Sequence, residues 1–377
     1  MNDDAKLALL PDGLHDDLPP AAGHEAATIE RLVGCFARHG YERVKPPLVE
    51  FEESLLTGPG QSVSRHMFRL MDPITQRMMG VRADMTTQLA RIAVTRLKGR
   101  PRPLRLCYSG QVLRVRGTQL RPERQFAQAG VELIGADALA ADAEMVLLAA
   151  EALRGVGIDN LSIDLTVPLL VPTICEGLGF NGEAAEAARR ALDRRDGGAV
   201  ARIPEPAGGL FAALMGAAGP AGEALAKLAA LDLPAAAGEA VTRLGDLVAL
   251  LAQADPDLAL TVDPAESRDF EYQTGVSFTL FARGVRGELG RGGRYDLATR
   301  ETATGFTLYM DSVMRAVPAA DAGRRLYLPA GIDRAVGAGL RADGWSTVQG
   351  FDEGGSQAAR ELGCTHIFDN GTVTALD

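Results

Sequence analysis

The stretch LRVRGTQLRPERQFAQAGVELIG, residues 113–135, decides the fold. Side chains alternate between the two faces of a strand, so Gln128 and Glu132 share one face of its second half, with Gly130 between them. The alanines and aliphatic residues in between fall on the opposite face and pack behind. We therefore expect a strand with an apolar rear face and, in front, a small polar hollow that could hold a ligand.

Two neighbouring segments also carry polar residues where a buried strand is normally apolar. Arg114 and Arg116 fall on one face of LRVR, at the start of the same stretch. Asp84 lies in VRADMT, just before Thr86, which can cap a helix that runs to about Lys98. These placements are compatible with a ligand site that draws on several segments.

The plain alternative is that these polar faces are solvated, as one side of an antiparallel sheet commonly is. Periodicity alone does not separate the two interpretations. A fourth polar segment favours a site, because Arg268 and Tyr272 stand at the head of a strand that is rich in Phe and Thr.

The remaining elements mix strands and helices without strict alternation. Apolar spacing predicts helices at about 22–39 and 137–154, and strands near 104–116 (a pair), 125–135, 157–166 and 270–282. GRGGRYD, residues 290–296, is typical of a tight glycine-rich turn, and a strand passes into a helix at about 304–317. This order favours an α+β fold with a central, mostly antiparallel sheet flanked by helices over a doubly wound fold.

Composition marks out two further regions. Residues 170–260 are rich in Ala and Leu with Gly and Pro breaks, which predicts a helical insert within a core of residues 1–325. Residues 326–377 alternate short strand and helix patterns, so we expect a small C-terminal α/β unit.

The composition excludes several classes of protein. With 39 Lys and Arg against 49 Asp and Glu, the net charge of -10 is a mild argument against a protein that mainly grips nucleic acid. The four cysteines show no C-x-x-C spacing, which favours a reducing, cytoplasmic home without disulfides. No stretch resembles a signal peptide or a membrane span of about 20 apolar residues. The five histidines form no H-x-x-x-H pair, so we expect no metal and no cofactor.

Five motifs in register over about residues 8–315 resemble the core of class II aminoacyl-tRNA synthetases, specifically histidyl-tRNA synthetase. The opening LLPDG resembles that of the family, GYERVKPPLVEF resembles motif 1, residues 113–135 resemble motif 2, and GGRYD followed by GFTLYMDSV resembles motif 3. RDFEYQTG is similar to the segment that reads R-G-L-D-Y-Y in the enzyme. Each motif is weak alone, but five in the same order are specific.

The resemblance implies a histidine-like amino-acid pocket. Asp84 falls where the family has a Glu that holds the substrate ammonium, with Thr86 and Arg114 beside it, and a carboxylate suits an ammonium through a charge-assisted hydrogen bond. Gln128 and Glu132 match the histidine-contacting Gln and Glu. The remaining positions are Arg268, which could meet a carboxylate, and Tyr272, which can close the pocket.

The same resemblance implies a degenerate ATP site and no catalytic residues. Arg116 replaces the motif 2 Glu that accepts from the adenine amino group, and a guanidinium has only donors. Ser312 stands where motif 3 has an Arg that stacks on adenine, and Tyr309 stands where the family has Gly. Residues 326–377 are too few for the family's anticodon-binding domain of roughly a hundred residues.

A synthetase core with a histidine pocket and these departures resembles a family of non-catalytic paralogues, the regulatory subunits of ATP phosphoribosyltransferase. That resemblance implies a short-form catalytic subunit as partner, a hetero-octamer of four plus four chains, class II dimers, and histidine as a feedback effector, without tRNA or membrane. Histidine acting at a subunit interface stays open, with the polar cluster as inherited scaffold. So do an active histidyl-tRNA synthetase and a stand-alone histidine-sensing paralogue.

Overall fold

The computed structural model describes residues 9–56, 64–118, 121–180, 182–266, 272–319, 323–351 and 354–376. Arg268 and the rest of the segment 267–271 lie outside the described residues. The chain divides into two compact units, Met1–Pro318 and Ala319–Asp377. Within the described residues no helix is long and apolar enough to cross a bilayer.

A nine-stranded sheet organises the first unit, in the order β1-β5-β6-β12-β11-β10-β7-β9-β8. The strands are β1 (Glu42–Arg43), β5 (Leu104–Leu113), β6 (Gln125–Ile134), β7 (Leu161–Thr166), β8 (Gly219–Pro220), β9 (Ala259–Val262), β10 (Gln273–Ala282), β11 (Gly290–Asp296) and β12 (Thr302–Tyr309). The six strands from β5 to β7 pair antiparallel, and parallel pairing is confined to β1 with β5 and β7 with β9. The expected α+β fold with a mostly antiparallel sheet is confirmed.

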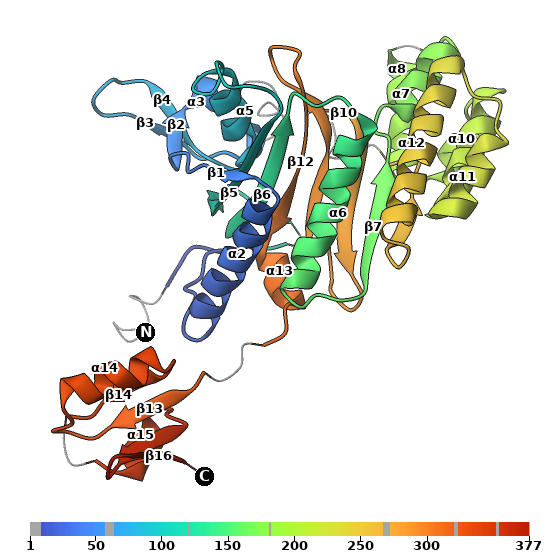
Figure 1. The fold of residues 1–377 in the computed structure, drawn as a ribbon. Helices are drawn as coiled ribbons and strands as arrows, with labels where there is room; N and C mark the ends of the chain where they lie inside the picture. The colour runs from blue at the N-terminus through green and yellow to red at the C-terminus, as the bar shows by residue number, and fades with distance from the viewer. Residues whose placement is uncertain are drawn as a thin grey trace. The chain divides into compact units, whose positions relative to one another are not determined.

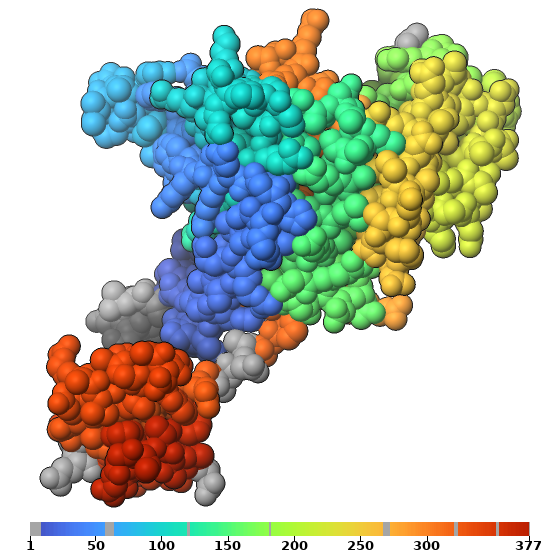
Figure 2. Space-filling model, viewed as in Figure 1, coloured from blue at the N-terminus to red at the C-terminus, as the bar shows by residue number. Residues whose placement is uncertain are grey.

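Two long helices cover one face of this sheet (Figure 1). They are α2 (Ala21–Arg38) and α6 (Leu139–Gly155), and α13 (Met310–Ala316) packs beside them. The small rear residues of β6 belong to this core, with Ala129 and Val131 fully buried. In the space-filling view the two helices hide the sheet from this side (Figure 2). The apolar rear face predicted for β6 is therefore the face against α2 and α6.

The opposite face is covered by α5 (Thr86–Val94) and by aromatic residues of the sheet itself. Beside it lies a three-stranded sheet of β2 (Val49–Phe51), β4 (Met78–Val81) and β3 (Arg69–Met71), with α3 (Glu52–Leu55) and the 3-10 turn η1 (Ser64–His66). Thr86 is the first residue of α5 and not its cap, which is Met85. The Asp84 carboxylate accepts from the Thr86 amide at 2.9 Å. The helix ends at Val94, earlier than expected.

Two strand predictions were wrong. GRGGRYD is not a turn but β11, which pairs antiparallel with both β10 and β12. Its glycines permit close packing: a Cβ on Gly292 would lie 2.3 Å from Cζ of Phe278. Residues 104–116 form one strand and not a pair, since β5 ends at Leu113 and the Arg114 amide bonds instead to the Arg124 carbonyl at 2.7 Å.

The helical insert is confirmed between β7 and β9. Its helices are α7 (Leu170–Gly177), α8 (Glu183–Asp193), α9 (Gly197–Val200), α10 (Ala207–Ala217), α11 (Ala221–Ala229) and α12 (Ala235–Ala254). One face of α12, including Leu244, Leu247 and Leu251, is fully buried. The insert is continuous with the main core, because these leucines belong to the same apolar cluster as the rear of the sheet.

The second unit has its own four-stranded sheet in the order β14-β13-β15-β16. Its elements are β13 (Arg325–Leu328), α14 (Arg334–Ala342), β14 (Ser346–Gln349), α15 (Ser356–Glu361), β15 (His366–Asp369) and β16 (Thr372–Ala375). β13 pairs in parallel with β14 and β15, while β16 closes the edge antiparallel. Tyr327 and Leu326 are buried on opposite sides of β13, so this unit has its own small core.

Candidate functional site

The polar face of β6 is buried. Gln128 is 0% exposed and Glu132 is 1% exposed, so the alternative of a solvated sheet face is wrong for these two residues. Buried polar groups are costly unless they are hydrogen-bonded. The hydrogen-bond partners of Gln128 and Glu132 therefore identify the residues of the candidate site.

Gln128 connects β6 to the segment that enters α5. Its amide Nε2 donates to Oδ2 of Asp84 at 2.9 Å, and its Oε1 accepts from the backbone amide of Met85 at 3.1 Å. The other oxygen of Asp84 is occupied by the Thr86 amide. Residues that lie 44 positions apart in the chain are thus fixed against each other.

Glu132 lies in a low-dielectric environment that disfavours its charge. Its pKa is raised from 4.5 to about 8, chiefly because of burial and also because of the nearby Asp84 carboxylate. Hydrogen bonds from the hydroxyls of Tyr295, at 2.8 Å, and Thr86 act in the opposite direction. The site therefore holds two adjacent carboxyl groups, one of which retains its proton near neutral pH.

Glycines on neighbouring strands leave the room that these side chains occupy. A Cβ on Gly305, which pairs with Glu132 across the β6–β12 ladder, would lie 2.2 Å from the Glu132 carboxylate. A Cβ on Gly130 would lie 2.5 Å from the Tyr108 hydroxyl, which bonds to Thr307 at 2.6 Å. Part of the predicted hollow over Gly130 is thus filled by Tyr108.

Aromatic rings pack beside this polar cluster. Tyr272 packs edge-on against Tyr295, with ring centroids 5.8 Å apart. Burial raises the pKa of the Tyr272 hydroxyl, with further contributions from Asp84 and Glu132, so Tyr272 lies in the field of both carboxyl groups. Sequence reasoning missed Tyr108 and Tyr295. The available signal was a tyrosine on β5, which pairs with β6, and another on β11, which pairs with β12.

Arg114 lies beside this pocket, beyond the end of β5. Its Nε donates to the Ala83 carbonyl at 3.3 Å, and its guanidinium carbon lies 5.1 Å from the centre of the Phe126 ring. Arg116, two residues further, is exposed. Because β5 ends at Leu113, neither arginine lies on a strand, and the predicted shared strand face is wrong.

Two of the positions matched to the ATP side, Tyr309 and Ser312, contact other side chains of the chain itself. The Arg121 guanidinium lies 3.8 Å from the centre of the Tyr309 ring and 4.5 Å from that of Phe126. It also pairs with Asp311 at 3.1 Å and Glu288 at 3.6 Å, and its side chain is 8% exposed. A buried cation held by two carboxylates and two rings fills this region.

Ser312 is also inaccessible. It is 0% exposed, and its hydroxyl accepts from Nη2 of Arg315 at 2.8 Å. Sequence reasoning assigned no role to Arg121, although it lies within residues 113–135, or to Arg315, which follows the segment matched to motif 3.

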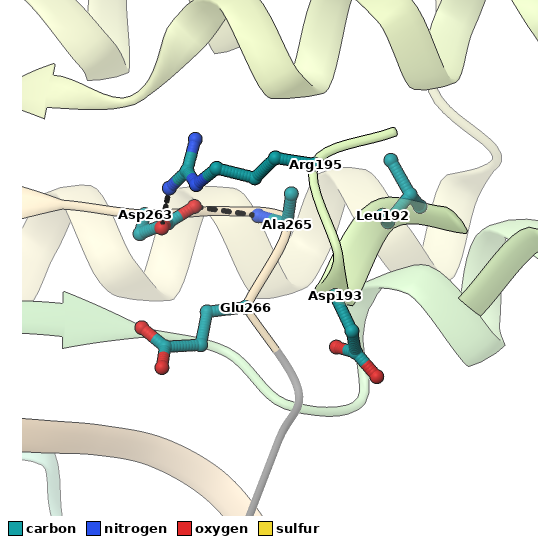
Figure 3. Close-up of a pocket in the computed structure, with 6 residues that line it drawn as sticks. All are labelled: Leu192, Asp193, Arg195, Asp263, Ala265 and Glu266. Atoms are coloured by element: carbon teal, nitrogen blue, oxygen red, sulfur yellow. Dashed lines mark hydrogen bonds and ion pairs between the residues drawn. The ribbon is translucent and has the colours of Figure 1, made fainter. Parts of the chain in front are cut away.

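Two cavities lie away from this pocket. One of about 380 Å³ lies between β10, β11, α7 and α12 and includes Arg294 and Thr274. The other, of about 230 Å³, is acidic and lies between α8 and the end of β9 (Figure 3). In it Arg195 pairs with Asp263, so the chain itself supplies a cation to these carboxylates.

Comparison with known proteins identifies the type of fold. A family model described as histidyl-tRNA synthetase matches residues 13–313. The ATP phosphoribosyltransferase regulatory subunit of Rhodospirillum centenum is 58% identical over 373 residues, covering 98% of this chain and 97% of that protein. The protein with the same name from Paramagnetospirillum magneticum is 55% identical, with 97% of both chains covered.

Solved structures agree on the fold. A Bacillus halodurans protein described as an ATP phosphoribosyltransferase regulatory subunit/histidyl-tRNA synthetase superposes with a TM-score of 0.83 at 22% identity, covering 96% of this chain and 97% of that one. The histidyl-tRNA synthetase of Nostoc sp. PCC 7120 gives a TM-score of 0.80 at 18% identity, with 95% and 90% covered. At these identities the two structures establish the fold alone.

Proposed function

Because the chain belongs to the family of ATP phosphoribosyltransferase regulatory subunits, built on a histidyl-tRNA synthetase-like core, we propose that it activates a separate short-form catalytic subunit and conveys feedback inhibition by histidine. Its relatives at 46–58% identity over nearly the whole chain carry that subunit name.

One observation carries the histidine pocket. Asp84 and Glu132 are two neighbouring carboxyl groups within one polar network, and among the described residues neither forms an ion pair with a basic side chain. Burying acidic groups without a cation is unfavourable, so this polar cluster favours a ligand that brings positive charge. A free amino acid with an ammonium and a basic ring has that chemistry.

Histidine fits the donors and acceptors that line the pocket. Asp84 can accept from its ammonium, and Glu132 can accept from an imidazole N–H. By the family resemblance, we propose that Arg268 meets its carboxylate and that Tyr272 covers its ring. Thr86 and Gln128 hold the Asp84 carboxylate in place, and the hydroxyls of Tyr295 and Thr86 bond to Glu132.

The nucleotide side supports a non-catalytic role. Arg121 occupies the faces of Tyr309 and Phe126, and Ser312 is buried beneath Arg315. Arg116 cannot accept from an adenine amino group. We therefore propose that the chain does not form an aminoacyl adenylate and does not act on tRNA.

Inhibition requires that histidine bind one state of the complex more tightly than the other. In the proposed assembly, four regulatory chains pair as class II dimers and join four catalytic chains. The pocket lies next to α5, whose first turn is bonded to Asp84 and Gln128. Ligand contacts at these two side chains would bias the position of α5.

The test is reconstitution with a short-form catalytic subunit. We expect formation of the ATP–phosphoribosyl pyrophosphate product to need this chain and to fall on addition of histidine. Glu132→Gln and Asp84→Asn should weaken inhibition at least about tenfold while leaving activation in place. The matched change at an exposed carboxylate, Glu223→Gln on α11, should alter neither.

Three outcomes would contradict the proposal. No co-purifying or activated catalytic subunit would refute the regulatory role. Unchanged inhibition in both pocket variants would indicate that histidine binds at a subunit interface or on the catalytic subunit instead. Histidine-dependent ATP–pyrophosphate exchange by this chain alone would favour a working synthetase.

A further inference from the structure

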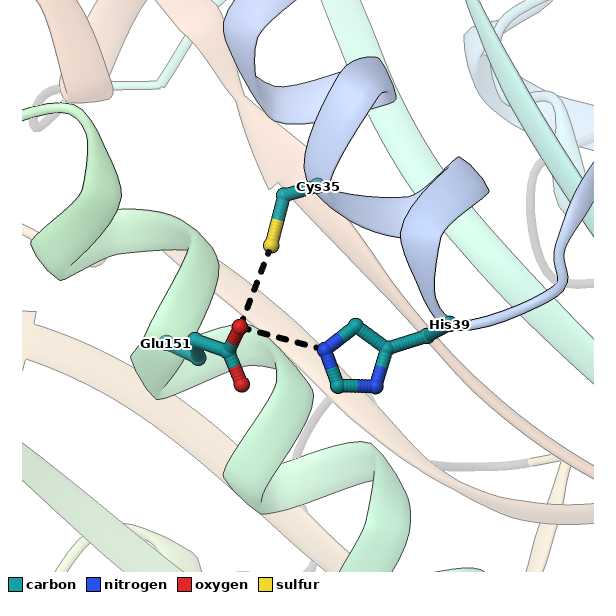
Figure 4. Close-up of side chains that lie close together, drawn as sticks. All are labelled: Cys35, His39 and Glu151. Atoms are coloured by element: carbon teal, nitrogen blue, oxygen red, sulfur yellow. Dashed lines mark hydrogen bonds and ion pairs between the residues drawn. The ribbon is translucent and has the colours of Figure 1, made fainter.

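A cysteine, a histidine and a glutamate converge on the outer side of the helical layer, far from the amino-acid pocket (Figure 4). Cys35 and His39 lie one turn apart at the end of α2, and Glu151 lies on the facing turn of α6. All three side chains point toward one another, with Oε1 of Glu151 between the other two. Their ligand atoms all lie within 4.8 Å of one another.

The distances match the edges of a small coordination polyhedron. Oε1 of Glu151 lies 3.1 Å from Nε2 of His39 and 3.8 Å from Sγ of Cys35. Zinc bonds of about 2.3 Å to sulfur and about 2.0–2.2 Å to nitrogen and oxygen separate tetrahedral ligands by about 3.4–3.6 Å. A small adjustment of exposed side chains brings the three donors to that spacing.

Burial and access fit a site open to solvent on one side. Cys35 is 4% exposed, while the side chains of His39 and Glu151 are 37% and 58% exposed. An ion can enter from solvent, take the thiolate at the base, and keep water as its fourth ligand, as three-ligand zinc sites do.

We propose that Cys35, His39 and Glu151 form a zinc-binding site that joins α2 to α6. Thiolate, imidazole and carboxylate are the ligand set that zinc accepts, whereas Ca²⁺ and Mg²⁺ prefer oxygen alone. The two anionic ligands balance the charge of the ion. Sequence spacing did not predict this site, because Glu151 lies 116 residues from Cys35.

Binding changes the protonation of the thiol. Burial raises the pKa of Cys35, the Glu151 carboxylate raises it further, and Arg38 lowers it. The metal–sulfur bond replaces the S–H bond, and one proton leaves to solvent. Arg38 is exposed, so its charge can turn away from the incoming cation.

The test is metal titration of the full chain after removal of metal with a chelator. Co²⁺ should bind with one equivalent per chain and give a thiolate-to-cobalt charge-transfer band, which Zn²⁺ abolishes by displacement. Zn²⁺ should also raise the midpoint of thermal unfolding, because it binds the folded state.

Variants separate this site from adventitious binding. Cys35→Ser should remove the charge-transfer band. His39→Ala and Glu151→Gln, both at exposed side chains, should lower zinc affinity at least tenfold, because even second-shell changes shift metal affinity by about 10–100-fold. Cys175→Ser and His24→Ala, which alter a cysteine on α7 and another histidine of α2, should change neither.

Absence of the band in the unmodified chain, or its persistence in Cys35→Ser, would overturn the proposal. Circular dichroism of each variant confirms that the fold is kept. The result does not depend on the proposed regulatory function, because neither a catalytic subunit nor histidine takes part in the assay.

Discussion

Replacing Glu132 by Gln should remove a pH dependence from the stability of this protein. The folded chain holds the Glu132 proton up to a pH of about 8, whereas the ordinary pKa of the group is 4.5. Between these values the folded state carries a proton that the unfolded chain has lost. The free energy of unfolding therefore falls as the pH rises through this window.

The size of the effect follows from the same two values. At about 1.4 kcal/mol per pH unit, the full window from 4.5 to about 8 corresponds to about 5 kcal/mol. Relative to low pH, where Glu132 is protonated in both states, this group lowers the free energy of unfolding by less than about 1 kcal/mol at pH 5. The decrease reaches about 3 kcal/mol at pH 7 and about 5 kcal/mol at pH 9. Gln keeps an oxygen that can accept from Tyr295 but carries no proton to lose.

Urea unfolding from pH 5 to pH 9, followed by circular dichroism, measures the difference. Apart from an offset that does not depend on pH, the free energy of unfolding of the Glu132→Gln variant should exceed that of the unmodified protein. The difference should be about 3 kcal/mol at pH 7 and about 5 kcal/mol at pH 9. Glu223→Gln, at an exposed carboxylate, is the matched control and should show no such gain. Parallel curves for Glu132→Gln and the unmodified chain would refute the reasoning.

Three other changes address the same network. Gly305→Ala would place a Cβ 2.2 Å from the Glu132 carboxylate; it should cost about 1–3 kcal/mol and abolish histidine binding measured by calorimetry. Asp84→Asn should weaken histidine binding, measured by calorimetry, more strongly than it lowers stability, measured by thermal unfolding. Arg121→Ala leaves Asp311 buried without its cation and should cost about 3–5 kcal/mol without creating ATP–pyrophosphate exchange; exchange activity in this variant would contradict the inference that the nucleotide side is lost.

Local periodicity was enough for much of the fold. The alternation in residues 125–135 placed the alanines of β6 against helices, and the Ala- and Leu-rich region 170–260 indicated the insert. The same reasoning failed for β11, because glycines that serve close packing between strands look like glycines that serve a turn. It also extended β5 past Leu113, since backbone pairing with residues elsewhere in the chain leaves no local signal.

The sequence by itself predicted the fold family, the sheet with one apolar and one polar face, and the proximity of Asp84, Gln128 and Glu132. Only the tertiary structure decided that this polar face is buried, that Tyr295 bonds to Glu132, and that the Arg121 guanidinium packs against the rings of Tyr309 and Phe126. The reason is physical: side-chain alternation is a property of one strand, whereas burial, hydrogen-bond partners and pKa depend on strands that are distant in the sequence.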